Sequence, residues 1–403
     1  EADIAEFRPD VLMISITTPS LAMDLVAAEV AKRINPDIVT VAKGAHFLVY
    51  DRETLARYPA LDCVIRGEYE LTAAEVGQGL PLEGIAGVTW RRSDGTIVQN
   101  PPRPFIEDLD SIPFPARHLV RNELYVRPDT MEPQTTIVTN RGCPHSCIYC
   151  LAPVVSGKRN RYRSVGNVLA EIEECVERFG IRNFLFRSDL FTVNKRWVMS
   201  LCQAIQEQGL DIQWSCNSRI DTLNEEMLRE MKKAGCWLIA FGVESGDPDM
   251  LEKMRKQLDF EKIEPAVKMC RRVGIKSSVY FLIGLPWESR ETFNRTKAFA
   301  RKLDPDFIEF FYSYPFHGTE FYDIAVKEGL LKDGELPKAA YNHPALPTLH
   351  LTLDELEPLR KEALRSFYLR PRFILRTLLK SPSPKILKNY MVYGMRQLRD
   401  LLR

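Results

Sequence analysis

Three cysteines share one short segment of the chain, at Cys143, Cys147 and Cys150, with the spacing CxxxCxxC. Three thiolates spaced in this way can bind three corners of a cubane iron–sulfur cluster. No fourth cysteine follows at ferredoxin spacing, so one iron would keep the open coordination position that catalysis at a metal requires. A structural zinc ion is the alternative, but it needs a fourth ligand, and His145 inside the loop is awkwardly placed. The loop therefore predicts a cluster with one reactive iron.

Polar and glycine-containing motifs follow the predicted strands downstream of this loop, at residues 186–192, 217–219, 241–246, 281–288 and 314–319. Any one of these motifs alone is typical of an ordinary turn after a strand. Their common order behind the cysteine loop favours a single site instead. Lys256 has two equally acceptable interpretations, a solvated cation at a helix end or a residue of the site. The other six cysteines are typical of small buried hydrophobic side chains.

Nearly all of the chain resembles the radical S-adenosylmethionine (SAM) superfamily. The resemblance is carried by the cysteine loop, which has Tyr149 before its third cysteine, and by the motifs that follow the loop in the sequence. The resemblance implies that the three cysteines bind a 4Fe-4S cluster whose open iron chelates SAM. It also implies that the reduced cluster cleaves SAM to a 5′-deoxyadenosyl radical that abstracts hydrogen. The cofactor contacts implied by the family's motifs are Tyr149, Asp189, Asn217, Arg219, Glu244, Ser245, Ile283 and Gly284. Arg219 is expected to pair with the SAM carboxylate, and Ser188 stands where the family usually has an acid.

The N-terminal segment resembles the second half of a cobalamin-binding domain. The resemblance rests on residues 15–18, 44–46, 62 and 67–68, which bring Ser, Thr and Gly side chains to strand ends. It implies cobalamin as a further cofactor. The Asp-x-His-x-x-Gly motif that supplies an axial ligand elsewhere is absent, so His46 is expected to be a turn or packing residue. The chain lacks an initiator Met and opens close to a buried strand, which predicts a fragment of a longer protein.

The elements that must position these residues alternate between strands and helices. Strands expected at 10–16, 38–42 and 63–65, with helices at 23–34 and 53–58, predict a parallel doubly wound sheet. A Ser-Asp-Gly turn at 93–95 and crowded prolines predict a hairpin and then a linker. Further strands are expected at 136–139, 183–186, 211–216, 237–241, 277–283 and 307–312. Six strand–helix units favour a partial (βα)6 barrel over a closed eightfold barrel.

The chain is accordingly expected to be an α/β protein with four parts. They are a partial cobalamin-binding-like Rossmann domain (1–80), a hairpin and Pro-rich linker (81–134), a radical SAM core (135–330) and a helical, basic C-terminal region (331–403). The basic and apolar residues of the last part are typical of a helical cap, with docking on an anionic membrane surface as the alternative.

The overall composition narrows the class of protein. The 403 residues carry a formal net charge of +1, which gives no electrostatic argument for a nucleic-acid partner. No signal peptide and no span of about 18 apolar residues is present, and unpaired cysteines suit a reducing compartment. We expect a cytoplasmic protein, with peripheral membrane contact through its tail as an option. An external flavodoxin or ferredoxin is the expected electron donor.

The predicted function is C–H activation by a radical SAM enzyme, with cobalamin-dependent methyl transfer as the leading reaction. Oxidative cyclisation of a tetrapyrrole or another large apolar substrate is the alternative within the same architecture. Aromatic residues in the segment 310–316 suggest a large apolar small-molecule substrate such as a lipid or a tetrapyrrole, and barrel core explains them equally well. A methylthiotransferase needs a second cluster, but only Cys63 precedes the core. The alternative outside the enzymes is a non-catalytic protein that binds cobalamin or a cluster.

Overall fold

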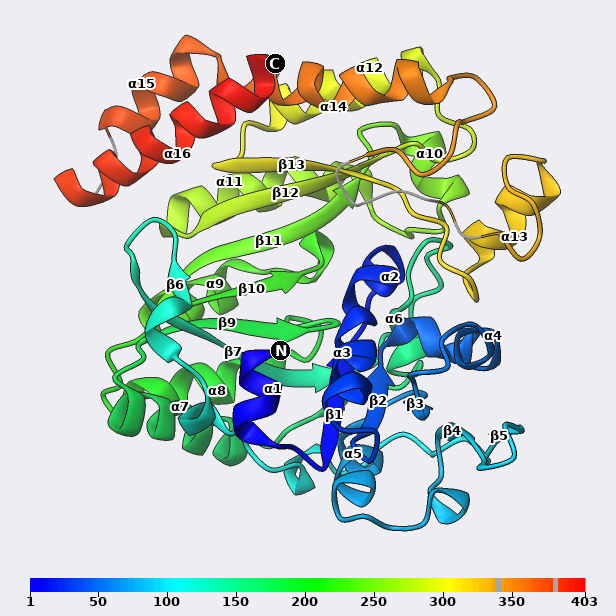
Figure 1. Ribbon diagram of the computed structural model, residues 1–403. Helices are drawn as coiled ribbons and strands as arrows, with labels where there is room; N and C mark the ends of the chain where they lie inside the picture. The colour runs from blue at the N-terminus through cyan, green and yellow to red at the C-terminus, as the bar shows by residue number, and fades with distance from the viewer. Residues whose placement is uncertain (336, 338–342, 380–382, 403) are drawn as a thin grey trace.

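Two β-sheets organise the chain, a five-stranded sheet near the N-terminus and an eight-stranded sheet in the core (Figure 1). The computed structural model describes residues 1–335, 337, 343–379 and 383–402. Parts of the predicted C-terminal region, residues 336, 338–342, 380–382 and 403, lie outside the described residues. Within the described part of the chain, no helix has the length and apolar character needed to cross a membrane.

The N-terminal sheet has the order β1-β2-β3-β4-β5, in which the first three strands are parallel and the last two pair antiparallel. Its strands are β1 (Val11–Ser15), β2 (Val39–Lys43), β3 (Cys63–Ile65), β4 (Val88–Arg91) and β5 (Ile97–Gln99). Helices α1 (Ala2–Phe7), α2 (Leu21–Asp24), α3 (Val26–Ile34), α4 (Asp51–Arg57) and α5 (Glu70–Gly77) accompany them. The expected doubly wound arrangement is confirmed. Helix α1 was not expected from the sequence, and none of its residues is buried, so no apolar pattern marks it.

The β4–β5 hairpin forms around the predicted Ser-Asp-Gly turn, but it extends the N-terminal sheet because β4 pairs with β3. The sequence alone groups this hairpin with the linker that follows it. We therefore propose a domain boundary after Gln99 rather than after residue 80. The remainder up to β6 (Val126–Arg127) contains only short 3-10 turns.

The core sheet contains six consecutive parallel strands in the order β7-β9-β10-β11-β12-β13, with β6 and β8 as short antiparallel additions to β7. The strands are β7 (Glu132–Arg141), β8 (Arg161–Tyr162), β9 (Asn183–Ser188), β10 (Gln213–Ser218), β11 (Cys236–Glu244), β12 (Lys276–Ile283) and β13 (Phe307–Tyr312). The sheet path ends at β13 and β6, which makes the sheet an open barrel. The predicted (βα)6 fold is confirmed, and β13 has the bounds that the sequence predicts.

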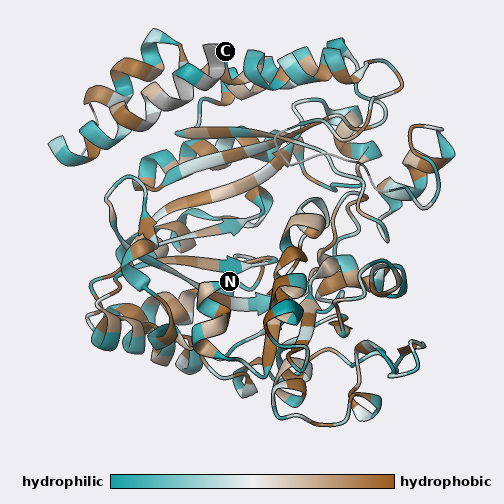
Figure 2. Cartoon of the chain, in the orientation of Figure 1, coloured by the Kyte–Doolittle hydropathy of each residue, from teal (hydrophilic) through white to brown (hydrophobic). Residues whose placement is uncertain are grey.

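Helices cover one face of this sheet and bury its apolar side chains in a single core. They are α7 (Val165–Phe179), α8 (Lys195–Glu207), α9 (Glu225–Lys233), α11 (Ile263–Val273) and α12 (Arg290–Leu303). Helices α10 (Pro248–Lys253) and α13 (Glu320–Lys327) instead pack in a second cluster with Ile148 and Leu285. Side chains alternate along each strand, so Phe186, Cys216 and Phe310 enter the core while their neighbours Arg187, Asn217 and Phe311 lie on the opposite, concave face. Figure 2 shows the helices with one hydrophobic and one hydrophilic side, as this packing requires.

The tail is helical, as expected, and consists of α14 (Leu353–Tyr368), α15 (Pro371–Leu379) and α16 (Pro384–Leu402), which lie beyond β13 (Figure 1). Helix α14 packs on β13, the last strand of the sheet. The Tyr368 hydroxyl bonds both the N–H and the carbonyl oxygen of Ile308, at 2.9 and 2.7 Å. Arg360 Nε donates to the carbonyl oxygen of Phe310 at 2.8 Å. Side chains of α14 thus form hydrogen bonds with backbone groups of β13 at the open edge of the sheet.

Candidate active site

The cysteine loop connects β7 to the short helix α6 (Ala152–Val155). It begins with Gly142, which has a φ of +97°, and a Cβ atom there would collide with the Arg159 carbonyl oxygen. The Gly142 N–H donates to Asp189 Oδ2 at 2.7 Å, and the Cys143 N–H donates to the Gly157 carbonyl oxygen at 3.0 Å. Asp189, a predicted cofactor contact at the end of β9, therefore anchors the start of the loop. Its direct contact with SAM stays a prediction.

The three thiols share the loop but differ in exposure. Cys143 is buried, while Cys147 and Cys150 are half-buried. Burial raises the pKa of Cys143, and it raises the pKa of Cys150 to about 11, so these two free thiols hold their protons at neutral pH. Metal binding at such thiols releases protons. Among the described residues, no three His, Cys, Asp or Glu side chains converge on a point as one metal ion requires.

Lys256 turns inward and forms a buried ion pair with Glu244. Its Nζ lies 2.8 Å from Glu244 Oε1 and 3.2 Å from the hydroxyl of Tyr149, which belongs to the cysteine loop. Glu244 has a φ of +69°, and the residues on either side of Lys256, Arg255 and Gln257, have φ values of +51° and +48°. Strained backbone at non-glycine residues is concentrated at functional sites. Lys256 is therefore part of the framework of the site. The sequence alone does not distinguish this role from that of a solvated cation at a helix end.

Arg219 lies in the same region, but its guanidinium is already engaged. Its Nε and Nη2 bind the two Asp221 carboxylate oxygens at 3.0 and 2.7 Å, and its Nη1 donates to the Lys256 carbonyl oxygen at 3.0 Å. A further contact reaches the carbonyl oxygen of Gln257 at 2.8 Å. The structure thus gives Arg219 a positioning role beneath the Lys256 loop. Pairing with the SAM carboxylate stays a prediction, with few donor groups left for it.

The remaining predicted contacts lie at the ends of β10, β11 and β12. Ser245 is buried and bonds Thr296 of α12 at 3.0 Å. Ile283 places its side chain in the core, so only its backbone can face a ligand. The Gly284 N–H donates to the buried Glu288 carboxyl group, whose pKa burial raises to about 8. Asn217 is exposed on the concave face.

Two serine hydroxyls support a polar ligand at this end of the barrel. Ser188 Oγ at the end of β9 and Ser313 Oγ just after β13 are buried, and neither has a hydrogen-bond partner among the described residues. An unpaired buried hydroxyl calls for a partner that the protein itself does not supply. The residues present therefore fit a polar cofactor between these strands, beside the three-cysteine loop that fits a cluster. Sequence reasoning treated Ser188 only as a departure from the family's acidic pair.

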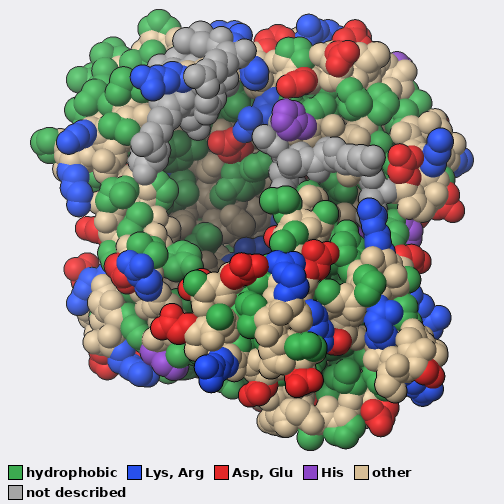
Figure 3. All heavy atoms as spheres, viewed as in Figure 1, with side chains coloured by type: hydrophobic (Ala, Val, Ile, Leu, Met, Phe, Trp, Pro, Cys, Tyr) green, Lys and Arg blue, Asp and Glu red, His purple; other side chains and the backbone are tan. Residues whose placement is uncertain are grey.

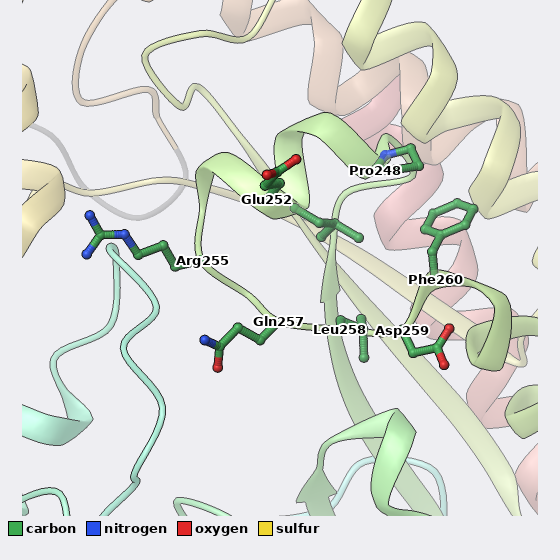
Figure 4. Close-up of a pocket in the computed structure, with 8 residues that line it drawn as sticks. Pro248, Glu252, Arg255, Gln257, Leu258, Asp259 and Phe260 are labelled. Carbon is green, nitrogen blue, oxygen red and sulfur yellow. The ribbon is translucent and has the colours of Figure 1, made fainter.

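A separate surface pocket of about 530 Å³ adjoins the Lys256 loop and contains none of the predicted site residues (Figure 4). In Figure 4, Arg255 and Gln257 point to one side and Pro248 and Phe260 lie on the other. Lys256 stands between two of the lining residues in the sequence, but its ammonium group pairs with Glu244 instead.

The N-terminal sheet brings its strand ends towards the core. Gly44 allows close packing, because a Cβ atom there would collide with the Ile16 carbonyl oxygen. His46 is buried, and its two ring nitrogens lie 3.3 Å from the Thr18 hydroxyl and 3.2 Å from the Thr54 hydroxyl. Burial lowers its pKa to about 4. This agrees with the expected packing role for His46.

Polar groups at this edge fit a ligand that carries a nucleotide tail. The hydroxyl-bearing side chains of Ser15 and Thr17 are exposed at the end of β1. At Gly67, a Cβ atom would meet only open space. His317 from the core packs against Tyr50 of the N-terminal domain at 5.1 Å between ring centroids, and its buried Nδ1 has no hydrogen-bond partner within the described residues. The donor set therefore fits cobalamin at the boundary between the two domains.

Comparison with known proteins gives the same division of the chain. The model of the radical SAM superfamily matches residues 137–300, and the model of the B12 binding domain matches residues 1–77. The chain is 34% identical to an uncharacterized methyltransferase of Pyrococcus horikoshii over 93% of its own length and 82% of that protein. It is 27% identical to the anaerobic magnesium-protoporphyrin IX monomethyl ester cyclase of Rubrivivax gelatinosus, over 75% of the chain but only 56% of the cyclase.

Solved structures share the fold at low sequence identity. The radical SAM methyltransferase TsrM of Kitasatospora setae superposes with a TM-score of 0.68 at 18% identity, over 89% of this chain and 72% of TsrM. The cobalamin-dependent radical SAM enzyme OxsB superposes with a TM-score of 0.73 at 15% identity, over 100% of this chain and 64% of OxsB. These structures share the fold, and the family is established by the relative from Pyrococcus horikoshii together with the two family models. The chain belongs to the radical SAM superfamily, as an enzyme with a B12-binding domain whose cofactors are a 4Fe-4S cluster, SAM and cobalamin.

Proposed function

We propose that this enzyme transfers a methyl group to an unactivated carbon of a small-molecule substrate. The observation that carries the proposal is the polar link between its two cofactor regions. Glu68 follows β3 in the B12-binding domain and binds Arg161 at 2.8 Å and Arg141 at 3.3 Å. Arg141 ends β7 and directly precedes the Gly142 turn of the cysteine loop. This buried network holds a B12-side strand end against the start of the cluster loop.

The chain's own residues would hold the cofactors and exclude water. When bound, the cluster and SAM supply a 5′-deoxyadenosyl radical that removes a hydrogen atom from carbon, and cobalamin supplies the methyl group. Cys143, Cys147 and Cys150 would bind the cluster, while Asp189 fixes the turn before them. The Lys256–Glu244 pair holds Tyr149, and hence the loop, against β11.

Two related proteins support methyl transfer, and a third supports the alternative reaction, oxidative cyclisation. The relative from Pyrococcus horikoshii is named a methyltransferase, as is the cytidylyl-2-hydroxyethylphosphonate methyltransferase of Streptomyces wedmorensis, which is 26% identical. The Rubrivivax gelatinosus relative instead favours oxidative cyclisation of a large apolar substrate such as a tetrapyrrole. Lipids and tetrapyrroles are therefore the substrate classes to examine first.

Anaerobic reconstitution tests the proposal. The enzyme is loaded with iron, sulfide and hydroxocobalamin, desalted and analysed for metals, then reduced with SAM that carries a deuterated methyl group. We expect about four irons and one cobalt per chain, 5′-deoxyadenosine, and a product that contains the labelled methyl group. A product that is oxidised but unlabelled would favour cyclisation. The variant with Cys143, Cys147 and Cys150 all replaced by Ala is the control and should lose both the cluster absorbance and 5′-deoxyadenosine. Zinc in place of iron would refute the proposal.

We also propose a cytoplasmic enzyme that takes its electron from a flavodoxin or ferredoxin and touches an anionic membrane through its tail. Exposed Ile374, Leu375, Leu378 and Leu379 on α15 support the membrane contact. Not all basic side chains of the tail are available to bind a membrane, because Arg370 and Arg376 both pair with Asp304, at 2.9 and 2.6 Å. Sedimentation with phosphatidylglycerol vesicles, compared with phosphatidylcholine vesicles, would test the contact.

A further inference from the structure

The concave face of the barrel carries a free guanidinium at Arg187. Phe184 and Phe186 on the same strand are fully buried in the helix-side core, so alternation directs Arg187 to the opposite face. Arg187 is exposed there, and no carboxylate or carbonyl oxygen in the described part of the chain pairs with it. Most arginines near the site are by contrast engaged, as Arg141, Arg161 and Arg219 show.

Strand pairing places Arg187 on a row of residues that crosses the sheet. Phe186 pairs with Cys216, so Arg187 and Asn217 stand side by side on adjacent strands. The row continues through Ala240 and Ser278 and reaches Phe307 at the beginning of β13. The row therefore runs along the inner wall, and it includes Asn217, which is also a predicted cofactor contact. Ala240 and Ser278 have small side chains, and both residues are buried.

An aromatic pair occupies the same face towards the far edge. Tyr280 and Phe311 meet edge to face, with 5.4 Å between ring centroids, and Phe311 is 40% exposed. The nearby acid, Glu309, lies 3.5 Å from Arg360 and stands four strands away from Arg187 in the sheet. Figure 3 shows a hollow on this side of the molecule, with hydrophobic side chains on its wall and a basic side chain in its depth.

We infer that this concave face binds the substrate as an amphiphilic oxyanion. A carboxylate or phosphate pairs with Arg187 beside the Asn217 amide, and an apolar or aromatic body lies towards Tyr280 and Phe311. A guanidinium matches both oxyanions in a two-point contact. Arg187 lies two residues before Asp189, which holds the cluster loop, so an anion bound there keeps the attached body near the reactive end of the barrel. The inference rests on the proposed function, because it names the substrate class of that same site.

Binding of matched probes tests the anion site without turnover. The probes are dansyl-aminoundecanoic acid, its neutral methyl ester and the phosphate monoester with the same chain, each measured by equilibrium dialysis against the reconstituted, unreduced enzyme. We expect the acid or the phosphate to bind at least about tenfold more tightly than the ester. Arg187→Met should remove that preference and leave ester binding unchanged. The tighter of the two anions identifies carboxylate or phosphate as the substrate group.

Arg196→Met is the control, since Arg196 is exposed on α8 in the outer layer. Equal binding of acid and ester, or a preference that survives in Arg187→Met, would overturn the inference. So would weaker SAM binding by Arg187→Met, because Arg187 would then serve the cofactor. 5′-Deoxyadenosine formation separates the two proposals. Intact SAM cleavage without an anion preference refutes only the inference, and an anion preference without cleavage refutes only the proposed function.

Discussion

At the scale of single residues, a few buried charges form the framework of the site, and the sequence singles out some of them but not Lys256. Lys256 and Glu244 have side chains that are each 10% exposed and lie 2.8 Å apart. The sequence does place Glu244 in a strand-end motif, because glycine and acid follow a recognisable apolar run. It leaves Lys256 undecided, because a lysine after a short helix is usually solvated. Its burial is set by tertiary contacts with Tyr149 and β11, which no local pattern records.

Replacement of Lys256 by Met should destabilise the enzyme by about 3–5 kcal/mol, because it leaves the Glu244 carboxylate buried without its partner. Denaturant titration of the apoprotein measures the loss in the free energy of unfolding. Lys253→Met is the matched control, since Lys253 is exposed on the preceding helix, and should change stability by no more than about 0.5 kcal/mol. Equal effects of the two substitutions would mean that the pair is not formed.

Glu288 gives a prediction about pH. Burial raises its pKa to about 8 from an ordinary value of 4.5, so between these values the folded protein holds a proton that the unfolded chain releases. Its contribution therefore makes stability fall as pH rises through this window, by up to about 1.4 kcal/mol per pH unit. Glu288→Gln should remove that contribution. Unfolding titrations from pH 5 to pH 8 compare the slopes for the two proteins, and parallel curves would refute the assignment.

At the scale of elements, the strands of the barrel were predictable and the loops between them were not. Apolar side chains recur along the core strands because helices bury one face of the sheet, and β13 has the predicted bounds. β7 extends well beyond the predicted 136–139, since it continues through polar residues that pair with β6 and β8. The hairpin β4–β5 was predicted from its turn, but its pairing with β3 is a long-range contact that turn chemistry does not specify.

The turn before the cysteine loop depends on a residue without a side chain. Gly142→Ala places a Cβ atom against the Arg159 carbonyl oxygen at a φ of +97°, a strain of about 1–3 kcal/mol or more. We expect the variant to fold with reduced stability and to assemble less cluster per chain, measured as bound iron and visible absorbance after reconstitution. Gly166→Ala on α7 is the control, because space is open there, and it should assemble cluster normally. Equal iron content in both variants would contradict the prediction.

At the scale of the whole molecule, the two domains are joined by the network around Glu68. Arg161 and Glu68 are each 4% exposed and 2.8 Å apart, and Glu68 also accepts the N–H of Ile106 at 2.7 Å. Arg161→Met should cost about 3–5 kcal/mol and loosen the B12-binding domain, detected as faster proteolysis between the domains and weaker retention of cobalamin. Arg33→Met removes an exposed pair with Glu1 and should cost at most about 1 kcal/mol. Unchanged proteolysis in Arg161→Met would show that the domains are held by other contacts.

The contact of α14 with β13 also bears on self-assembly. A parallel sheet that does not close into a barrel offers its last strand as a template for another chain, the usual route to edge-to-edge aggregation. Tyr368 and Arg360 take up the polar groups of Ile308 and Phe310 that a foreign strand would need. Helix α14 therefore covers part of the open edge of the sheet and disfavours pairing of β13 with a strand of another molecule.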